Sequence, residues 1–258
     1  MGENNKETKH ISEEELRTKY DELCKKIKLG NDNSNNDDIK EMKKLLVDAL
    51  IKYKAILFGD FVLKSKNKSK YYVATGFLNN AISANIVSFL LSDLILSKKL
   101  SFDYLFGPSY KGIPIVTLTS HFLLTSNKFH NIFFLYDRKE KIDYGDKSFI
   151  VGNLEENYIG NVQVEKKNVI IIDDVFSYGI VLTDIFNKMK AFEYLEIVAW
   201  VVIINRNEYE MNEKNEKVYY KDILEQKHNI PIYSLINGND DISHLIKNLE
   251  NFLKKYIL

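Results

Sequence analysis

One short segment limits the folds open to this chain: the sequence VIIIDDVFSYG at residues 169–179. Four β-branched apolar residues come first, then Asp173 and Asp174, and then a short loop that contains a glycine. A strand that is apolar on both faces is typical of a parallel sheet with helices on each side. Ligands bind outside the carboxyl ends of the strands in such sheets, so the two carboxylates are candidate functional groups.

The rest of the sequence alternates between apolar runs and amphipathic segments, as a parallel α/β sheet requires. Apolar residues at helical spacing, after a Ser12–Glu15 capping box, predict a helix over 13–28. Further helices are expected at 39–53, 79–98, 112–124, 179–190 and 239–256. Strands are expected at 56–65, 70–78, 102–107, 131–136, 168–175, 195–204 and 231–236, with a hairpin of 148–154 and 161–165.

The domain organisation follows from a break near the N-terminus. The stretch GNDNSNNDD at 30–38 is rich in turn-forming residues and predicts a flexible linker. We therefore expect an N-terminal appendage over 1–38, made of one helix and this linker, and a compact domain over 39–258.

The charge balance excludes some classes of partner. The chain has 36 basic and 36 acidic residues and a formal net charge of zero. This argues against binding nucleic acid through bulk charge and against broad attraction to anionic membranes. No apolar run approaches the ~20 residues that span a bilayer. Cys24 is the only cysteine, so no intrachain disulfide forms. We expect a cytoplasmic protein without nucleic-acid or membrane partners.

The acidic strand end suits a phosphorylated sugar as ligand. Backbone amides at the start of the following helix bind a phosphate well, and two carboxylates bind ribose hydroxyls. The alternative is structural, because a single Asp at such a position is commonly an N-cap of the helix. Two acids followed by Ser177 and Gly179 in a tight loop favour the functional interpretation.

Two further segments carry concentrated polar chemistry. GPSYKGIP at 107–114 places Tyr110 and Lys111 in a turn stiffened by two of the chain's three prolines, as in an anion cradle. The alternative is an ordinary turn with an exposed lysine. The loop 137–147 carries Arg138, one of only three arginines, among seven other charged residues. The alternative there is a solvated loop without function.

Together these segments resemble the orotate phosphoribosyltransferases, a branch of the type I phosphoribosyltransferases. The resemblance covers about residues 40–258, and the matching segments occur in the family's order and spacing. They are FGDFVLKSKNKSKYY (58–72), FDYLFGPSYKGIP (102–114), DRKEKIDYGD (137–146), the acidic strand and loop, and INRNE (204–208).

The resemblance implies a fold and an activity. The fold would be the type I phosphoribosyltransferase fold, an α/β parallel sheet flanked by helices with a small hood subdomain formed by the 40–75 region and the C-terminal part. The activity would be Mg²⁺-dependent transfer of phosphoribose from 5-phosphoribosyl 1-pyrophosphate (PRPP) to orotate, giving orotidine 5′-phosphate and pyrophosphate in pyrimidine synthesis.

The resemblance also implies an assembly. It implies a homodimer in which the lid loop 137–147 closes over the neighbouring subunit's site. The chain ends about one helix after its last strand, so we expect a monofunctional form, like those of some eukaryotes and protozoa. This leaves room for a non-covalent complex with orotidine 5′-phosphate decarboxylase, docking on 1–38.

The resemblance assigns roles residue by residue. Pyrophosphate would be bound by Lys111, Arg138 and Lys139. Asp173 and Asp174 would bind the ribose and, through substrate or water, the metal. Lys111, Arg138, Lys139 and Asp174 would be catalytic residues, and we add Lys141 to them as a hypothesis of our own. PRPP would contact Tyr110, Lys111, Arg138, Lys139, Asp173, Asp174, Val175, Phe176, Ser177, Tyr178, Gly179, Ile180 and Val181. Orotate would contact Lys64, Tyr72, Val73, Ser177 and Arg206.

The sequence departs from the family at two places. In the lid, the family's Lys and His positions are Ile142 and Tyr144 here, and we hypothesise that Lys141 takes the leaving-group role. In the phosphate loop, Ile180 replaces a hydroxyl residue, which puts the affinity for PRPP in doubt.

Two alternative functions follow from these departures. One is a phosphoribosyltransferase for a purine or uracil, although an arginine such as Arg206 suits a base that carries a carboxylate. The other is a PRPP-binding regulatory module with weak catalysis.

Overall fold

The computed structural model describes residues 11–29, 36–62, 68–140, 149–154, 158–159, 162–163 and 165–238. The chain divides after Leu90 into two compact units, and the division falls within helix α3 (Ala81–Ser97). Each unit is described by itself. The described residues contain no candidate for a membrane-spanning helix.

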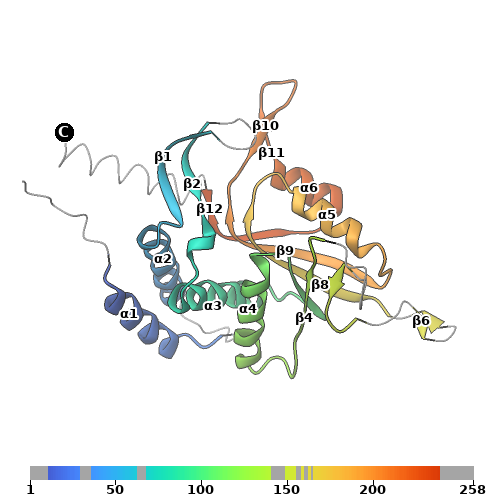
Figure 1. Cartoon of the computed structure of the whole chain (residues 1–258), viewed down its shortest axis with the longest axis horizontal. Coiled ribbons are helices and arrows are strands. Elements are labelled where there is room, and N and C mark those ends of the chain that lie inside the picture. The colour runs from blue at the N-terminus through green and yellow to red at the C-terminus, as the bar shows by residue number, and fades with distance from the viewer. Residues whose placement is uncertain are drawn as a thin grey trace, which may run out of the picture. The chain divides into compact units, whose positions relative to one another are not determined.

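The first unit pairs two amphipathic helices and a hairpin (Figure 1). Helix α1 (Glu13–Lys26) begins after Ser12, whose hydroxyl accepts the Glu15 N–H at 3.0 Å, as the capping box predicts. Helix α2 (Asn36–Lys52) packs against α1. It begins at Asn36, so the end of the predicted linker is helical instead. Tyr53 also donates a hydrogen bond of 2.6 Å to Glu13.

The hairpin of the first unit consists of β1 (Ile56–Val62) and β2 (Lys68–Val73), which pair antiparallel. A short 3-10 helix, η1 (Thr75–Phe77), follows. The hairpin confirms the two strands that the sequence predicts here, although β2 begins two residues earlier and ends before η1. Whether residues 1–38 act as a separate appendage stays a prediction.

The second unit is built on a six-stranded sheet in the order β12–β9–β8–β3–β4–β5. All neighbours are parallel except β5, which pairs antiparallel with β4. The strands are β3 (Tyr104–Gly107), β4 (Phe133–Asp137), β5 (Ile150–Val151), β8 (Lys167–Phe176), β9 (Leu195–Asn205) and β12 (Ile232–Asn237). The predicted parallel α/β sheet is therefore confirmed.

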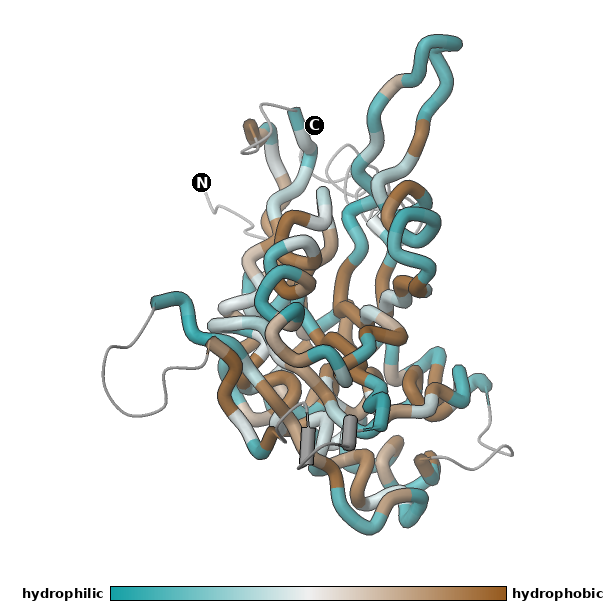
Figure 2. Tube along the Cα trace, turned by 90° about the vertical axis from the view of Figure 1, so that its right-hand side faces the viewer, coloured by the Kyte–Doolittle hydropathy of each residue, from teal (hydrophilic) through white to brown (hydrophobic). Residues whose placement is uncertain are grey.

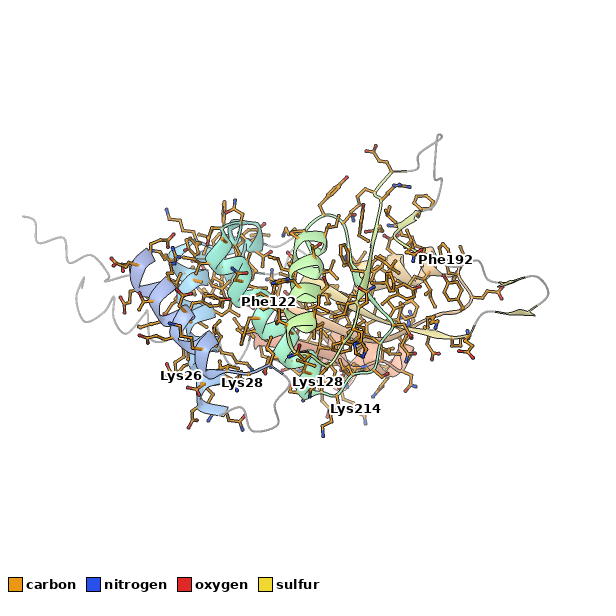
Figure 3. All side chains as sticks on the ribbon, turned by 90° about the horizontal axis from the view of Figure 1, so that it is seen from below. Lys26, Lys28, Phe122, Lys128, Phe192 and Lys214 are labelled. Atoms are coloured by element: carbon orange, nitrogen blue, oxygen red, sulfur yellow. The ribbon has the colours of Figure 1, made fainter. Side chains whose placement is uncertain are left out.

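In its described residues the second unit has three helices besides the end of α3. They are α4 (Gly112–Thr125), α5 (Ile180–Met189) and α6 (Tyr220–His228). The interior is apolar and includes Trp200, whose ring meets that of Phe176 edge to face at 5.2 Å. Exposed lysines such as Lys128 and Lys214 lie at the periphery (Figure 3).

Three features of this unit differ from the sequence predictions. The hairpin of 148–154 with 161–165 is wrong, because β5 pairs with β4 while β7 (Val162–Gln163) pairs with β6 (Tyr158–Ile159). The hairpin of β10 (Tyr209–Met211) and β11 (Lys217–Tyr219) was not predicted, nor was α6. The tip of β10–β11 is hydrophilic, as its teal colour shows (Figure 2). The predicted helix 239–256 lies outside the described residues.

Candidate functional site

The strand order brings two strand ends together at one edge of the sheet. From β3 the sheet continues to β4, whereas from β8 it continues to β9 and β12 in the opposite direction. β3 and β8 are parallel neighbours, with Tyr104 opposite Val169. Where the strand order reverses in this way, a crevice opens outside the carboxyl ends and ligands bind there. The loops after β3 and β8 therefore form the candidate site.

The two carboxylates at the end of β8 have different surroundings. Asp173 is 5% exposed, and its Oδ1 accepts the Asp174 N–H at 2.8 Å. Burial, together with the adjacent Asp174 carboxylate, raises the pKa of Asp173 well above its usual range. Asp174 accepts the Val175 N–H at 2.9 Å, and its Oδ2 lies 2.8 Å from Lys111 Nζ. The Lys111–Asp174 ion pair joins the loop after β3 to the end of β8.

Two glycines give the loop between β3 and α4 its compact form. A Cβ on Gly107 would lie 2.4 Å from the carbonyl oxygen of Gly112. A Cβ on Gly112 would lie 2.6 Å from Pro108 Cδ. A carbon atom does not approach so closely without a shift of the backbone or the ring, so both positions require glycine.

The tip of the same loop carries the two residues that the sequence singled out. Tyr110 is 69% exposed, and the side chain of Lys111 is 55% exposed. The peptide bond between Ser109 and Tyr110 is cis. The loop thus presents an aromatic ring and a cation at the strand edge where the carboxylates lie.

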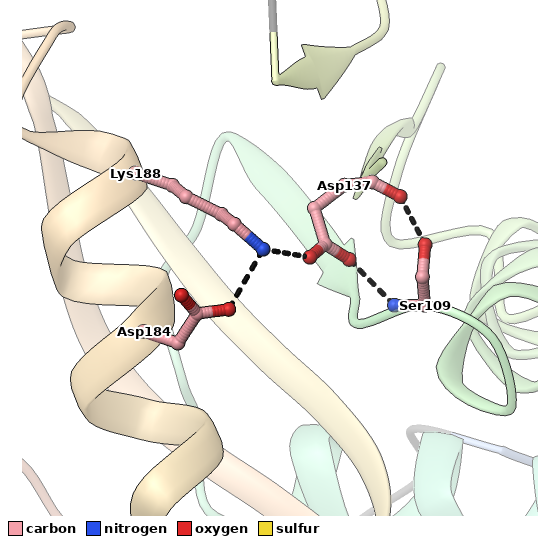
Figure 4. Close-up of polar contacts among 4 residues, drawn as sticks. All are labelled: Ser109, Asp137, Asp184 and Lys188. Atoms are coloured by element: carbon pink, nitrogen blue, oxygen red, sulfur yellow. Dashed lines mark hydrogen bonds and ion pairs between the residues drawn. The ribbon is translucent and has the colours of Figure 1, made fainter. Parts of the chain in front are cut away.

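A buried ionic network connects this loop to β4 and α5 (Figure 4). Asp137, the last residue of β4, is 2% exposed, and its Oδ1 accepts the Ser109 N–H at 2.5 Å. Its Oδ2 lies 2.6 Å from Lys188 Nζ, which also contacts Asp184 Oδ2 at 2.7 Å. The Ser109 hydroxyl donates to the Asp137 carbonyl oxygen.

The loop after β8 ends in a glycine that no other residue replaces easily. Gly179 has φ +74°, and a Cβ there would lie 2.0 Å from Leu224 Cδ1. Helix α5 begins directly after it without a side-chain cap. The first N–H groups of a helix have no partner within it, so they are open to an anion. Ile180, in the first turn, is 77% exposed.

Arg206 lies just beyond the end of β9 and faces an acid of its own chain. Its Nε is 3.1 Å from Glu208 Oε1, and both side chains are largely buried. The other carboxylate oxygen of Glu208 accepts the Tyr178 hydroxyl at 3.0 Å. One carboxylate therefore connects the loop after β8 with the arginine after β9. The Tyr178 ring also meets that of Tyr220 edge to face at 4.9 Å.

All predicted site residues except Lys64 and Lys141 lie within the described part of the chain. The structure brings Lys111 together with Asp174, and it places residues 173–181 on one strand end, loop and helix start. Arg138 and Lys139 follow β4 directly, and the Arg138 N–H donates to the Phe149 carbonyl at 2.8 Å. Lys141 and most of the loop 137–147 lie outside the described residues.

The predicted orotate residues of the N-terminal half belong to the first unit. Lys64 lies outside the described residues. Tyr72 is 45% exposed, and its ring lies 5.7 Å from that of Phe61. Val73 is buried and pairs with Ile56 across the hairpin.

Sequence reasoning missed four residues of the site region, each of which has a partner at least 28 residues away in the sequence. They are Ser109, Asp137, Lys188 and Glu208. The i, i+4 spacing of Asp184 and Lys188 was visible and is typical of a helix-surface ion pair. That spacing gives no hint of the buried Asp137.

The carboxylates fit a metal that a substrate brings with it. Among the described residues, no group of three or more His, Cys, Asp or Glu side chains could hold a metal ion. Mg²⁺ is commonly bound through one or two carboxylates plus phosphate oxygens and water. Asp173 and Asp174 supply such a pair, and Asp174 already contacts Lys111, which suits an indirect role.

Comparison with known proteins points to one family, although no family model matches the sequence. An orotate phosphoribosyltransferase of Yarrowia lipolytica is 30% identical over 204 residues, which are 78% of this chain and 87% of that protein. An orotate phosphoribosyltransferase of Buchnera aphidicola is 30% identical over 220 residues, 84% of this chain and 94% of that protein.

Solved structures agree with these relatives. The orotate phosphoribosyltransferase of Francisella tularensis superposes with a TM-score of 0.59 at 25% identity, covering 82% of this chain and 90% of that one. The UMP synthase of Leishmania donovani superposes with a TM-score of 0.58 at 23% identity, covering 81% of this chain but 38% of that one. The expected type I phosphoribosyltransferase fold is therefore confirmed.

Proposed function

This chain belongs to the orotate phosphoribosyltransferase family, and from that premise we propose how its own residues carry out the reaction. The reaction transfers the phosphoribosyl group of PRPP to orotate, giving orotidine 5′-phosphate and pyrophosphate for pyrimidine synthesis. The observation that carries the proposal is the 2.8 Å contact of Lys111 with Asp174 at the reversal of the strand order.

The PRPP site is assigned to the loops after β3 and β8. The open N–H groups at the start of α5 bind the 5′-phosphate, helped by Ser177. Asp173 and Asp174 accept hydrogen bonds from the ribose hydroxyls. Lys111, already held at the edge by Asp174, binds the pyrophosphate. Ile180 is exposed and contributes its backbone N–H instead of a hydroxyl.

The base site is assigned to Arg206. A guanidinium recognises a carboxylate through two parallel hydrogen bonds, and orotate carries a carboxylate whereas uracil and the purines do not. Glu208 lies beside the Nε of Arg206 and so orients the guanidinium. Lys64, Tyr72, Val73 and Ser177 are proposed to complete the contacts with orotate.

Charge stabilisation drives the chemical step. The bond from C1 of the ribose to oxygen breaks with its electron pair on the departing pyrophosphate, while N1 of orotate forms the new bond to C1 and loses its proton to solvent. Negative charge grows on the pyrophosphate oxygens, so cations placed there lower the barrier. Lys111, Arg138, Lys139 and Lys141 are assigned this role, the last three from the loop 137–147.

Mg²⁺ is proposed as the cofactor, held by Asp173 and Asp174 through substrate oxygens or water. Bound there, it supplies positive charge against the pyrophosphate. The described carboxylates fit this indirect role better than direct ligation, because Asp174 already contacts Lys111 and Val175.

A homodimer in the cytoplasm is proposed as the working form, with the loop 137–147 of one subunit closing over the other subunit's site. A complex with orotidine 5′-phosphate decarboxylase is also proposed. It is supported by the Leishmania UMP synthase, of which this chain matches only 38%. If deletion of residues 1–38 abolishes co-purification of the decarboxylase, docking on this segment is supported. Retained binding would count against that docking site.

A panel of bases tests the proposed substrate. The purified protein is mixed with PRPP and Mg²⁺ and with orotate, uracil or hypoxanthine in turn. We expect consumption of orotate alone. Turnover of uracil or hypoxanthine would indicate another phosphoribosyltransferase, and PRPP binding without any turnover would favour a regulatory module.

A further inference from the structure

The network around Asp137 combines a buried charge with a position beside an anion site. Asp137 is 2% exposed, and the side chain of Lys188 is 14% exposed. Breaking such a buried ion pair by removing one partner leaves an uncompensated charge. Although burial lowers the pKa of Lys188, its contacts with Asp137 and Asp184 raise that pKa overall, so the amine stays charged.

The carboxylate of Asp137 also holds in place the 108–111 loop, to which the proposed function assigns pyrophosphate binding. Its Oδ1 accepts the Ser109 N–H, and the Ser109 hydroxyl returns a hydrogen bond to the Asp137 carbonyl. Ser109 is two residues before Lys111, and Asp137 immediately precedes Arg138. The position of Asp137 therefore influences Lys111 and Arg138, two of the proposed pyrophosphate cations, through the backbone.

This arrangement creates an electrostatic conflict. A carboxylate is a strong acceptor for a backbone N–H. The same carboxylate repels the highly charged pyrophosphate that the neighbouring loop binds, and repulsion is weakly screened at a buried site. Lys188 is the cation in contact with that carboxylate, and it comes from α5, the helix whose first turn is assigned to the 5′-phosphate (Figure 4).

We propose that Lys188 is a positioning residue of the pyrophosphate site, which neutralises Asp137 so that this acid can hold the 108–111 loop without repelling pyrophosphate. The proposal rests on the proposed function for the identity of the anion. It explains why a lysine near the end of α5 is buried against β4 while its i−4 partner Asp184 is half-exposed.

Three variants separate charge compensation from simple packing. Lys188→Met removes the cation, and Lys188→Met/Asp137→Asn removes both charges while the Asn side-chain oxygen still accepts the Ser109 N–H. Lys190→Met is the matched control, because Lys190 caps the same helix and is exposed. The readouts are KM for PRPP, KM for orotate, kcat, and the Kd of pyrophosphate with Mg²⁺ from calorimetry.

Lys188→Met should raise KM for PRPP and the Kd of pyrophosphate by about tenfold or more, as expected for one uncompensated charge near the anion. KM for orotate should change by less than about threefold. The double variant should return both anion constants to within about threefold of wild type, and Lys190→Met should leave them unchanged.

Two results would overturn the proposal: wild-type anion constants in Lys188→Met, or a double variant no better than the single one. If Lys188→Met does not fold, Asp137→Asn serves instead. That variant should bind pyrophosphate at least as well as wild type, and a tenfold loss would contradict the proposal. Pyrophosphate calorimetry tests the role of Lys188 even if the wild-type protein does not use orotate, a result that would count against the proposed function alone.

Discussion

At the scale of single residues, Glu208 is the group that connects the two proposed substrates. One of its oxygens accepts the Tyr178 hydroxyl at 3.0 Å and the other lies 3.1 Å from Arg206 Nε. Tyr178 stands in the loop assigned to PRPP, and Arg206 is assigned to orotate. We therefore expect a structural change in the loop after β8 to alter the position of Arg206 through the Glu208 carboxylate.

Removing the Tyr178 hydroxyl tests this connection. Tyr178→Phe deletes one hydrogen bond to a charged group, an interaction of about 1.5–3 kcal/mol when fully formed. We expect KM for orotate to rise by about five- to tenfold, with little change in KM for PRPP. Tyr209→Phe is the control, because Tyr209 is exposed and follows Glu208. Equal KM values for orotate in Tyr178→Phe and wild type would separate Tyr178 from the base site.

The raised pKa of Asp173 predicts how the free energy of unfolding depends on pH. Its pKa in the folded protein is raised by burial and by Asp174, above the usual 3.8. A carboxyl with a raised folded pKa stabilises the fold fully below its unfolded pKa, and this stabilisation is lost as the pH rises through the folded value. Asp173→Asn keeps an acceptor for the Asp174 N–H but has no proton to lose.

The free energy of unfolding of Asp173→Asn should therefore exceed that of wild type at pH 7, and the difference should shrink toward pH 4. Urea unfolding at several pH values measures this. The variant should also lose activity, since Asp173 is assigned to the ribose. A difference that grows as the pH falls would show that burial of this carboxylate is not the dominant effect.

At this scale the sequence predicted Asp173, Asp174 and Lys111 as candidate site residues. It did not predict the residues that hold the site in position. The run of apolar residues before Asp173 identified a strand end, and the prolines and glycines identified the loop of Lys111. Asp137 and Lys188 are 51 residues apart, and only the folded sheet brings them together. A buried ion pair between distant residues leaves no periodic pattern for a single sequence to reveal.

At the scale of elements, the loop between β8 and α5 depends on one glycine. Gly179 has φ +74° and its α-carbon packs against Leu224 of α6. Gly179→Ala adds a Cβ too close to Leu224 Cδ1, so the Leu224 side chain, the loop or α6 must shift, and an alanine at this positive φ is strained. We expect a loss of about 1–3 kcal/mol in the free energy of unfolding and weaker PRPP binding.

Gly76→Ala is the matched control, because a Cβ at Gly76 meets nothing within 4 Å. Thermal unfolding of the two variants should give a Tm several degrees lower for Gly179→Ala, and a nearly unchanged Tm for Gly76→Ala. If both variants melt with wild-type Tm, the loop after β8 is not constrained by its contact with α6.

The elements themselves were predicted unevenly. Long apolar strands such as β8 and β9 were found because continuous β-branched runs have few other interpretations. The pairing of β5 with β4 was not predicted, because an alternating pattern shows which face of a strand is buried but not which strand it pairs with. The β10–β11 hairpin has three-residue, mostly exposed strands, which resemble a loop in composition.

At the scale of the whole molecule, the dimer proposal makes the sharpest prediction. If the loop 137–147 serves the other subunit, each site takes Asp174 from one subunit and Arg138 from its partner. Arg138→Ala and Asp174→Asn then damage parts of a site that come from different subunits. Mixing the two inactive proteins should form heterodimers that each contain one intact site. Random exchange would restore about a quarter of wild-type activity.

Subunit exchange is first allowed in mild denaturant, and the activity of the mixture is compared with that of each variant alone. No recovery despite exchange, verified with a tagged subunit, would indicate that the loop acts on its own subunit's site. The net charge of zero is compatible with such self-association, because it creates no overall electrostatic repulsion between two copies of the chain.

We assign phosphoribosyl transfer to the edge where β3 and β8 meet, with Lys111 and Asp174 at the centre of the site. The most direct test follows the loss of orotate absorbance with PRPP and Mg²⁺ for wild type, Asp174→Asn and the exposed control Asp222→Asn. We expect turnover by wild type and the control that needs both PRPP and Mg²⁺, and a loss of at least about a hundredfold in Asp174→Asn. Undiminished turnover by a folded Asp174→Asn variant would contradict this site assignment.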